Sequence, residues 1–100
     1  MFEVASYITE LPSASERAQI DRYFERQRTL GFRLKEPVSK TLRGPIHEIR
    51  PGAHRFLFFY HKGQMIIVHS FRKKSRHTPE KEIGAAVRKR QAYLNEGAAQ

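Results

Sequence analysis

The sequence predicts an α+β domain with an N-terminal helical hairpin, a small antiparallel sheet of three or four strands, and a C-terminal helix. This prediction rests on the spacing of apolar residues along the chain. They recur at helical spacing up to Leu30, alternate with a period of two over Pro45–Phe71, and return to helical spacing after Thr78. A chain of 100 residues, 39% of them hydrophobic, has room for one core. We therefore expect a single domain over residues 1–95 and a flexible tail over residues 96–100.

The first two elements are predicted to be helices. Apolar residues over Val4–Leu11 follow the spacing of an amphipathic helix, and Pro12 cannot continue it. The stretch Ser13–Glu16 then has the form of a capping box, and the apolar stripe that follows it ends at Gly31. Residues 1–30 are therefore expected to form a helical hairpin.

Strands are expected after a polar and basic stretch, Phe32–Gly44, which Pro37 interrupts and which holds at most a short strand. Three runs then alternate with a period of two: Ile46–Arg50, His54–Tyr60 and Gln64–Phe71. Strict alternation divides the residues of the last two runs into opposing sets. The sets are Arg55, Leu57 and Phe59 against His54, Phe56, Phe58 and Tyr60, then Met65, Ile67, His69 and Phe71 against Ile66, Val68 and Ser70.

Both sets on each strand carry large apolar side chains, so both faces of the sheet must be covered. Three helices cover one face well, and we expect part of the second face to be left for a bound partner. The last helix is predicted to begin at Thr78-Pro79, where Thr78 is a suitable N-cap and Pro79 fits the first helical position. Glu80 and Glu82 add negative charge that complements the helix dipole.

The net charge of the chain limits the classes of partner that it is expected to bind. Nineteen Lys and Arg against ten Asp and Glu give a formal net charge of +9, which favours nucleic acid, an anionic membrane surface or an acidic protein. No apolar stretch approaches the roughly 20 residues that span a bilayer, so we expect no membrane partner. Without cysteine there is no disulfide framework, and we expect a cytoplasmic protein.

A cationic run, Arg72–His77, lies between the last predicted strand and the last helix, where five of its six side chains can be cationic. Donors held in a fixed arrangement suit a phosphate backbone. The hairpin registers are expected to bring strand residues to this run. The resulting site candidates are Arg50, His54, Arg55, His69, Lys73, Lys74 and Arg76.

Arg55 is the most informative of these candidates, because a cation on the same face of a central strand as Leu57 and Phe59 loses hydration. It needs either a carboxylate, such as Glu48, or an anionic ligand, and the sequence leaves both open. His69 alternates with apolar residues and is more typical of a satisfied, half-buried histidine than of a catalyst.

Known metal and nucleotide motifs are missing from the chain. The five histidines form no HxH or HExxH pattern and no cysteine accompanies them, so we expect neither a metal nor a cofactor. Metal-free RNA cleavage stays open, because it needs only a group that takes the 2′-OH proton, cations at the phosphate, and a group that protonates the leaving 5′-oxygen.

Several segments together carry a family resemblance. They are Lys40-Thr41-Leu42-Arg43-Gly44, His47-Glu48-Ile49-Arg50, Arg55-Phe56-Leu57-Phe58-Phe59, Ile66–Ser75 and Thr78–Ile83. In their order and spacing the chain resembles the RelE/ParE toxin superfamily, in its HigB-like, phage Gp49-like branch, over about residues 4–94. The most specific part is the pattern F-x-K-K-S/T-x-x-T-P-x-x-E-I.

The resemblance implies a RelE-like fold and the toxin of a type II toxin–antitoxin pair. Such a toxin is an mRNA interferase, commonly acting in the ribosomal A site, and a cognate antitoxin, here expected to be of the helix-turn-helix type, neutralises it. By position, Arg55 matches the strand arginine that contacts the scissile phosphate, and Lys73 matches the basic residue after the last strand. Lys74 and Arg50 match as supporting phosphate contacts, and Lys40 as a weaker RNA-binding candidate. The match does not fix the general base and acid, for which His54, His69 and Tyr93 are open candidates. Arg76 and Tyr93 are expected as further RNA-binding residues.

One feature departs from the family pattern. Its members usually begin with a strand before the first helix, whereas here Met1 falls almost directly at that helix. A sheet without that strand would expose an edge. One alternative to the nuclease is therefore a truncated, inactive module that binds RNA or an antitoxin. Another is a gyrase poison, because ParE-like relatives of the same fold act on DNA gyrase without cutting RNA.

Overall fold

The computed structural model describes residues 4–34 and 38–99, so that the predicted interruption at Pro37 lies outside the described residues. The predicted α+β class and order of elements are confirmed. The elements are α1 (Val4–Thr9), α2 (Ala14–Leu30), the 3-10 helix η1 (Gly31–Arg33), β1 (Ser39–Arg43), β2 (Ile46–Ile49), β3 (His54–His61), β4 (Gln64–Arg72) and α3 (Glu80–Ala99).

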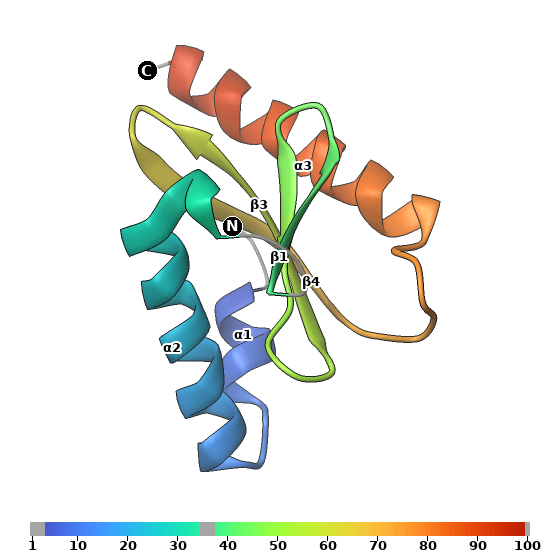
Figure 1. The fold of residues 1–100 in the computed structure, drawn as a ribbon. Helices are drawn as coiled ribbons and strands as arrows, with labels where there is room; N and C mark the ends of the chain where they lie inside the picture. The colour runs from blue at the N-terminus through green and yellow to red at the C-terminus, as the bar shows by residue number, and fades with distance from the viewer. Residues whose placement is uncertain (1–3, 35–37, 100) are drawn as a thin grey trace.

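The strands form a single sheet in the order β1-β2-β3-β4, with every neighbouring pair antiparallel (Figure 1). The sheet has four strands because the polar stretch before Gly44 does contain a short one, β1. Tight turns join the strands, and Gly44 and Gly63 adopt φ of 52° and 76° there, a region that favours glycine. Short connections of this kind fix the register of each hairpin.

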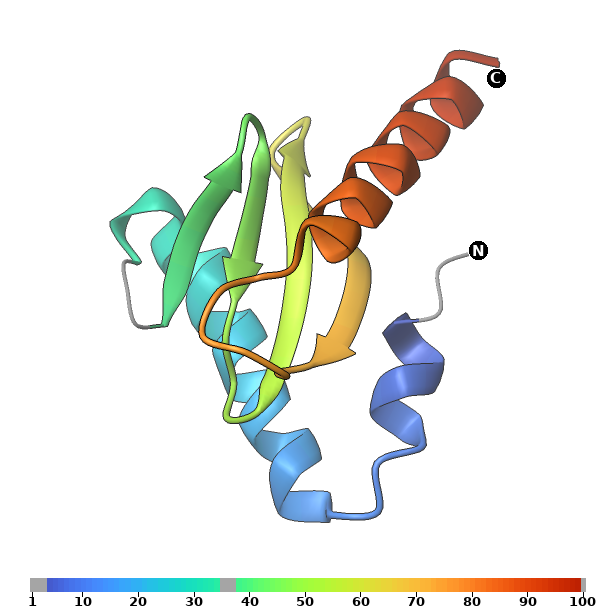
Figure 2. The same cartoon turned by 90° about the vertical axis from the view of Figure 1, so that its right-hand side faces the viewer.

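Helices cover both faces of the sheet, as Figures 1 and 2 show. On one face, Ile20 and Phe24 of α2 pack with Phe56 and Phe58 of β3. On the other face, Ala86 of α3 belongs to a second buried cluster. That cluster contains Ile46, Leu57, Phe59, Val68, Phe71 and Ala86. The expectation that the helices share one face is therefore wrong, because the apolar side chains on the second face are buried by α3.

A β-bulge corrects the predicted alternation of the last strand. Leu57 lies opposite His69, but Phe58 lies opposite Ile67, so Val68 is the extra residue on β4. Ile67 consequently packs with the cluster beneath α1 and α2, whereas His69 turns to the face that carries α3. The prediction that Ile67 and His69 share a face is wrong, because one inserted residue reverses the phase of everything after it.

The helix ends agree with the predicted signals at α2 but not at α3. Ser13 caps α2 by accepting a hydrogen bond from the Glu16 N–H at 3.2 Å, and Gly31 ends the helix with φ of 55°. Helix α3 begins at Glu80 and continues to Ala99. The tail expected from residue 96 is thus still helical over its described part.

The aromatic centre of the larger cluster gives a stability prediction. Phe56 is fully buried, and its ring meets Phe24 edge-on with centroids 4.9 Å apart. Phe56→Ala should lower the free energy of unfolding by about 3–5 kcal/mol, since it removes buried contacts and leaves a cavity. The control Val87→Ala, at a side chain 40% exposed, should change it by less than about 0.5 kcal/mol. Urea unfolding measures both, and equal effects would contradict this account of the core.

Candidate functional site

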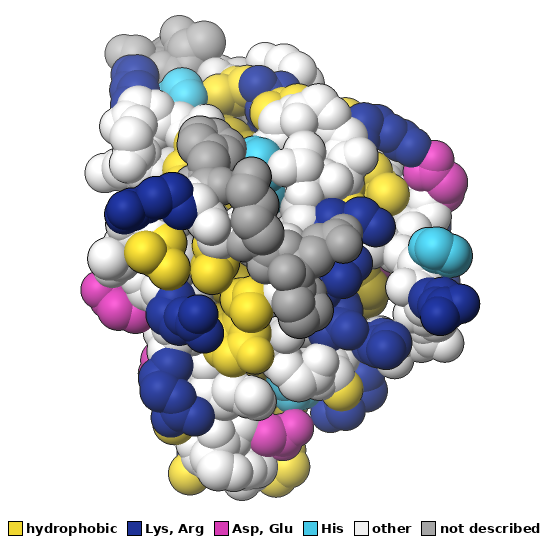
Figure 3. Space-filling model, in the orientation of Figure 1, with side chains coloured by type: hydrophobic (Ala, Val, Ile, Leu, Met, Phe, Trp, Pro, Cys, Tyr) yellow, Lys and Arg dark blue, Asp and Glu magenta, His cyan; other side chains and the backbone are white. Residues whose placement is uncertain are grey.

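A concave, strongly basic site lies where the turn between β2 and β3 meets the loop between β4 and α3. We call this loop, Lys73–Pro79, the basic loop; in Figure 2 it runs from the end of β4 across the sheet to the start of α3. The site, called the cationic cleft below, is lined by Glu48, Arg50, Arg55, Phe71, Lys73, Lys74, Ser75, Arg76, His77, Thr78 and Pro79. Figure 3 has the orientation of Figure 1, and Lys and Arg side chains gather on its right-hand side, where Figure 1 shows the basic loop.

The cleft brings together Arg55 and Lys73, as the hairpin registers predict. Arg55 lies near the start of β3, and Lys73 directly follows β4, its antiparallel partner. The Lys73 N–H donates to the carbonyl of Ala53 at 2.8 Å, which extends the pairing by one bond beyond the strands. Three more predicted RNA contacts, Arg50, Lys74 and Arg76, line the same cleft.

Glu48 forms the floor of the cationic cleft. Its side chain is fully buried, and its carboxylate accepts a hydrogen bond from Arg50 Nε at 2.6 Å and another from the hydroxyl of Thr78. The carboxylate therefore ties β2 to the basic loop. A buried charge is tolerated only when it is paired and hydrogen-bonded, and Glu48 meets both conditions.

The carboxylate considered as a partner for Arg55 was Glu48, but Glu48 pairs with Arg50 instead. Nη1 of Arg55 donates to the carbonyls of Gly52 and His54, each at 2.8 Å. Burial lowers the pKa of Arg55, Glu48 opposes that effect, and Arg50 adds to it. Arginine nevertheless stays charged at neutral pH, and the guanidinium has further N–H donors for an anion.

His54 does not reach the cationic cleft. It is 1% exposed and lies on the face of the sheet that α1 and α2 cover. Its Nδ1 lies 2.8 Å from the Tyr7 hydroxyl, and its Nε2 lies 3.1 Å from Glu16 Oε1. Burial raises the pKa of Tyr7, so the phenol keeps its proton at neutral pH and its hydroxyl forms a hydrogen bond with Nδ1. His54 thus joins the two N-terminal helices to the sheet.

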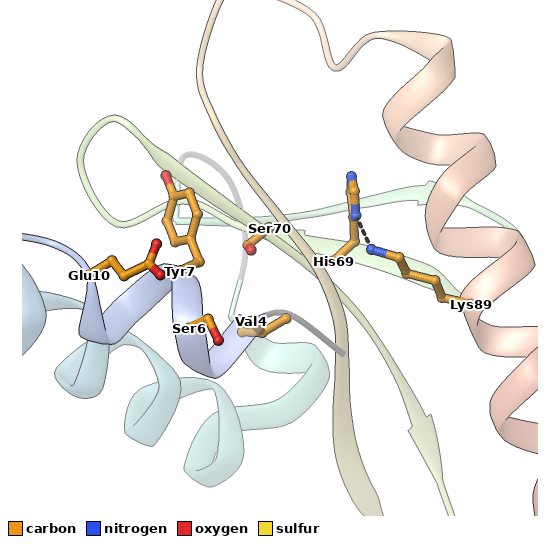
Figure 4. A pocket seen from close by; sticks show the side chains of 7 residues that line it. All are labelled: Val4, Ser6, Tyr7, Glu10, His69, Ser70 and Lys89. Carbon is orange, nitrogen blue, oxygen red and sulfur yellow. Dashed lines mark hydrogen bonds between the residues drawn. The ribbon is translucent and has the colours of Figure 1, made fainter. Parts of the chain in front are cut away.

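His69 also lies outside the cationic cleft, and it is satisfied and half-buried as predicted. Lys89 Nζ lies 2.8 Å from Nδ1, and Glu82 Oε1 lies 2.9 Å from Nε2. Because an ammonium group only donates, Nδ1 accepts and Nε2–H donates to Glu82. Figure 4 shows His69 and Lys89 together with Tyr7 and Glu10 around a cavity of about 420 Å³ between α1, β4 and α3.

Two further predicted site residues lie apart from the cleft lining. Tyr93 of α3 packs its ring against Phe59 and His61, with centroids 5.7 and 5.9 Å away, at the opposite end of β3 from Arg55. Lys40 lies opposite Glu48 in the register of β1 and β2, and so sits on the sheet beside the cleft.

Sequence reasoning missed Glu48 as the floor of the cleft and His77 as part of its lining. His77 does stand in the cationic run, and its position directly before Thr78-Pro79 was the available signal. Over residues 4–34 and 38–99, no group of three or more His, Asp or Glu is placed to hold a metal ion. In the same part of the chain, no helix is long and apolar enough to cross a membrane.

Comparison with known families gives a match over most of the chain. The family described as phage-derived protein Gp49-like (DUF891) matches residues 6–91, a span that includes every strand and most of α3. No curated protein matches the chain.

The buried carboxylate leads to a stability prediction. Glu48→Ala should lower the free energy of unfolding by about 3–5 kcal/mol, because it leaves Arg50, whose side chain is 20% exposed, without its partner. The control is Glu25→Ala, which breaks an exposed ion pair with Arg28 and should cost less than about 1 kcal/mol. Thermal and urea unfolding of both variants test this, and a Glu48→Ala protein as stable as the control would show that the carboxylate does not hold the loop.

Proposed function

Because the chain belongs to the phage-derived Gp49-like family, we propose that it is the toxin of a type II toxin–antitoxin pair and acts as an endoribonuclease on messenger RNA. The finer assignment, to the HigB-like branch of the RelE/ParE superfamily, is part of this proposal. So are its partners: messenger RNA on the ribosome, and a cognate antitoxin of the helix-turn-helix type. Cytoplasmic location follows from these partners.

The observation that carries the proposal is the convergence of cations on one cleft from separate segments of the chain. Arg55 comes from β3, and Lys73, Lys74 and Arg76 come from the basic loop. Charge-assisted hydrogen bonds from such groups hold a phosphate more firmly than neutral donors do. The pairing of β3 with β4 and the bond from Lys73 N–H to Ala53 fix the relative positions of the two segments before any ligand arrives.

The chemistry that suits this cleft is attack of an RNA 2′-OH on the adjacent phosphate. A bond forms between the 2′-oxygen and phosphorus, and the bond from phosphorus to the 5′-oxygen breaks, leaving a 2′,3′-cyclic phosphate and a 5′-OH. The pentavalent transition state carries more negative charge than the substrate. Cations already in place stabilise that extra charge without reorganisation, which is how Arg55 and Lys73 would accelerate cleavage.

The antitoxin is expected to present an acidic segment to the same cleft. A net charge of +9 favours association with an acidic partner, and a segment seated among the cations would exclude RNA. Neutralisation by simple competition for one cleft would need no change in the fold of the toxin.

Removing either central cation should abolish toxicity. We expect Arg55→Ala and Lys73→Ala to relieve growth arrest on induction and to slow RNA cleavage by translating ribosomes about 10²- to 10³-fold, the usual effect of losing one transition-state donor. The control is Arg26→Ala, which removes the same charge from an exposed position on α2 and should leave toxicity unchanged.

Other results would point to the alternatives. Growth arrest with signs of DNA damage and intact messages would favour a gyrase poison. Absence of arrest, with RNA binding retained, would favour an inactive binding module. Arrest that is equally strong in all three variants would mean that the cationic cleft is not the active site.

Salt dependence tests the contact between the basic loop and the phosphate backbone. The logarithm of the affinity for an uncleavable, 2′-O-methylated single-stranded RNA should fall linearly with the logarithm of the salt concentration. Lys74→Ala should reduce the steepness of that line by about 0.7, the value for one phosphate contact on a single strand. Arg26→Ala should leave it unchanged, and equal slopes for both variants would remove Lys74 from the interface.

A further inference from the structure

We infer that His77 is the general base of this cleft and takes the proton from the attacking 2′-OH. This inference rests on the proposed endoribonuclease function. It assigns the general base, which the family resemblance does not identify. It follows from what the other groups of the cleft can and cannot do at neutral pH.

The cleft is rich in groups that donate protons or hydrogen bonds and poor in groups that accept a proton. The charged and titratable groups that line it are Glu48 and Arg50 at the end of β2, Arg55 of β3, and Lys73, Lys74, Arg76 and His77 of the basic loop. Arginine and lysine are cations at neutral pH and have no acceptor. They can stabilise the phosphate, and a lysine can protonate the leaving oxygen, but none can remove the 2′-OH proton.

Among the residues that the structure describes, Glu48 is the one carboxylate of the cleft lining, and it is already engaged. It is fully buried, one of its oxygens accepts from Arg50 Nε, and the other accepts from the Thr78 hydroxyl. If Glu48 took a proton, its ion pair with Arg50 would be lost. The Arg50 side chain is only 20% exposed, so its charge would be left largely buried and unpaired. Glu48 therefore shapes the cleft and is unsuited to accept protons in each catalytic cycle.

The histidines that alternate along the strands are engaged in the same way. Both ring nitrogens of His54 and both of His69 are within hydrogen-bond distance of a partner, and neither residue lines the cleft. His77 differs in each respect. It lies in the cleft lining, it is exposed, and among residues 4–34 and 38–99 no hydrogen bond to its ring is found.

The backbone around His77 is held in place while its ring stays accessible. The Ser75 hydroxyl donates to the His77 carbonyl at 2.6 Å, and Thr78, the next residue, is anchored on Glu48. The ring thus projects from a short stretch that is fixed on both sides. Histidine is the only side-chain type whose ordinary titration lies between about pH 5 and 8, so it serves best as a base at neutral pH.

In the step proposed here, neutral His77 takes the proton of the 2′-OH as the 2′-oxygen bonds to phosphorus. The bond to the 5′-oxygen breaks, and that oxygen takes a proton from a lysine of the basic loop or from water. The imidazolium then returns its proton to solvent, and the group that protonated the 5′-oxygen takes a proton back from solvent. Charge and protons balance, and the reaction needs no co-reactant beyond the RNA.

The test uses the full chain with ribosomes translating a defined message, and follows cleavage from pH 5 to 8. His77→Ala should cleave at least about 100-fold more slowly, the usual contribution of a general base, and should bind 2′-O-methylated RNA with an affinity within about twofold of the wild type. The wild-type rate should rise about tenfold per pH unit on its acidic limb and then level off, and His77→Ala should lack that limb.

Two further variants separate a base from a mere positive charge. His77→Lys keeps a cation at neutral pH and should remain as slow as His77→Ala, whereas added imidazole should restore part of the rate to His77→Ala alone. His61→Ala, at the last residue of β3, is the matched histidine control and should cleave with an unchanged pH profile.

The outcomes distinguish this inference from the function on which it rests. If the wild type cuts no message at any pH, both are overturned. If the wild type cuts and His77→Ala cuts equally fast with the same acidic limb, or if His77→Lys restores the rate, the nuclease stands and His77 is not its base.

Discussion

The cationic cleft depends on the hydrogen bonds that the buried carboxylate of Glu48 accepts from Arg50 and Thr78. This carboxylate lies at the centre of the sheet's basic end, where it neutralises Arg50 and binds Thr78 of the basic loop. Without a negative charge there, Arg50, Arg55 and the lysines of the loop would repel one another across a partly buried surface. One carboxylate therefore lets a small domain hold many cations in a fixed arrangement.

The two faces of the sheet serve different purposes. On the face beneath α1 and α2, polar groups close on one another: His54 joins Tyr7 and Glu16 in an array that leaves no ring nitrogen for a ligand. On the face that carries α3, the basic loop runs across the sheet to the start of that helix, and its cations Lys73, Lys74 and Arg76 are exposed. On this same face, His69 is held between Glu82 and Lys89 of α3, whereas His77 of the basic loop is exposed.

The distribution of protons follows from this arrangement. A cleft made of guanidinium and ammonium groups stabilises a phosphate but cannot deprotonate a hydroxyl group, so it needs one acceptor that is both exposed and unpaired. Using Glu48 would sacrifice the floor of the cleft. A base on the basic loop avoids that conflict, because His77 takes the proton while Glu48 stays ionised and keeps its hydrogen bond to Thr78 of the loop.

The sequence by itself determined the elements and the meeting of Arg55 with Lys73. Both follow from local information: periodicity places the strands, and a tight hairpin brings the start of one strand beside the end of the next. Only the tertiary structure decided that Glu48 binds Arg50, that a bulge at Val68 turns His69 toward α3, and that α3 covers the second face. These outcomes depend on packing between segments far apart in the chain, and on one inserted residue that periodicity cannot register.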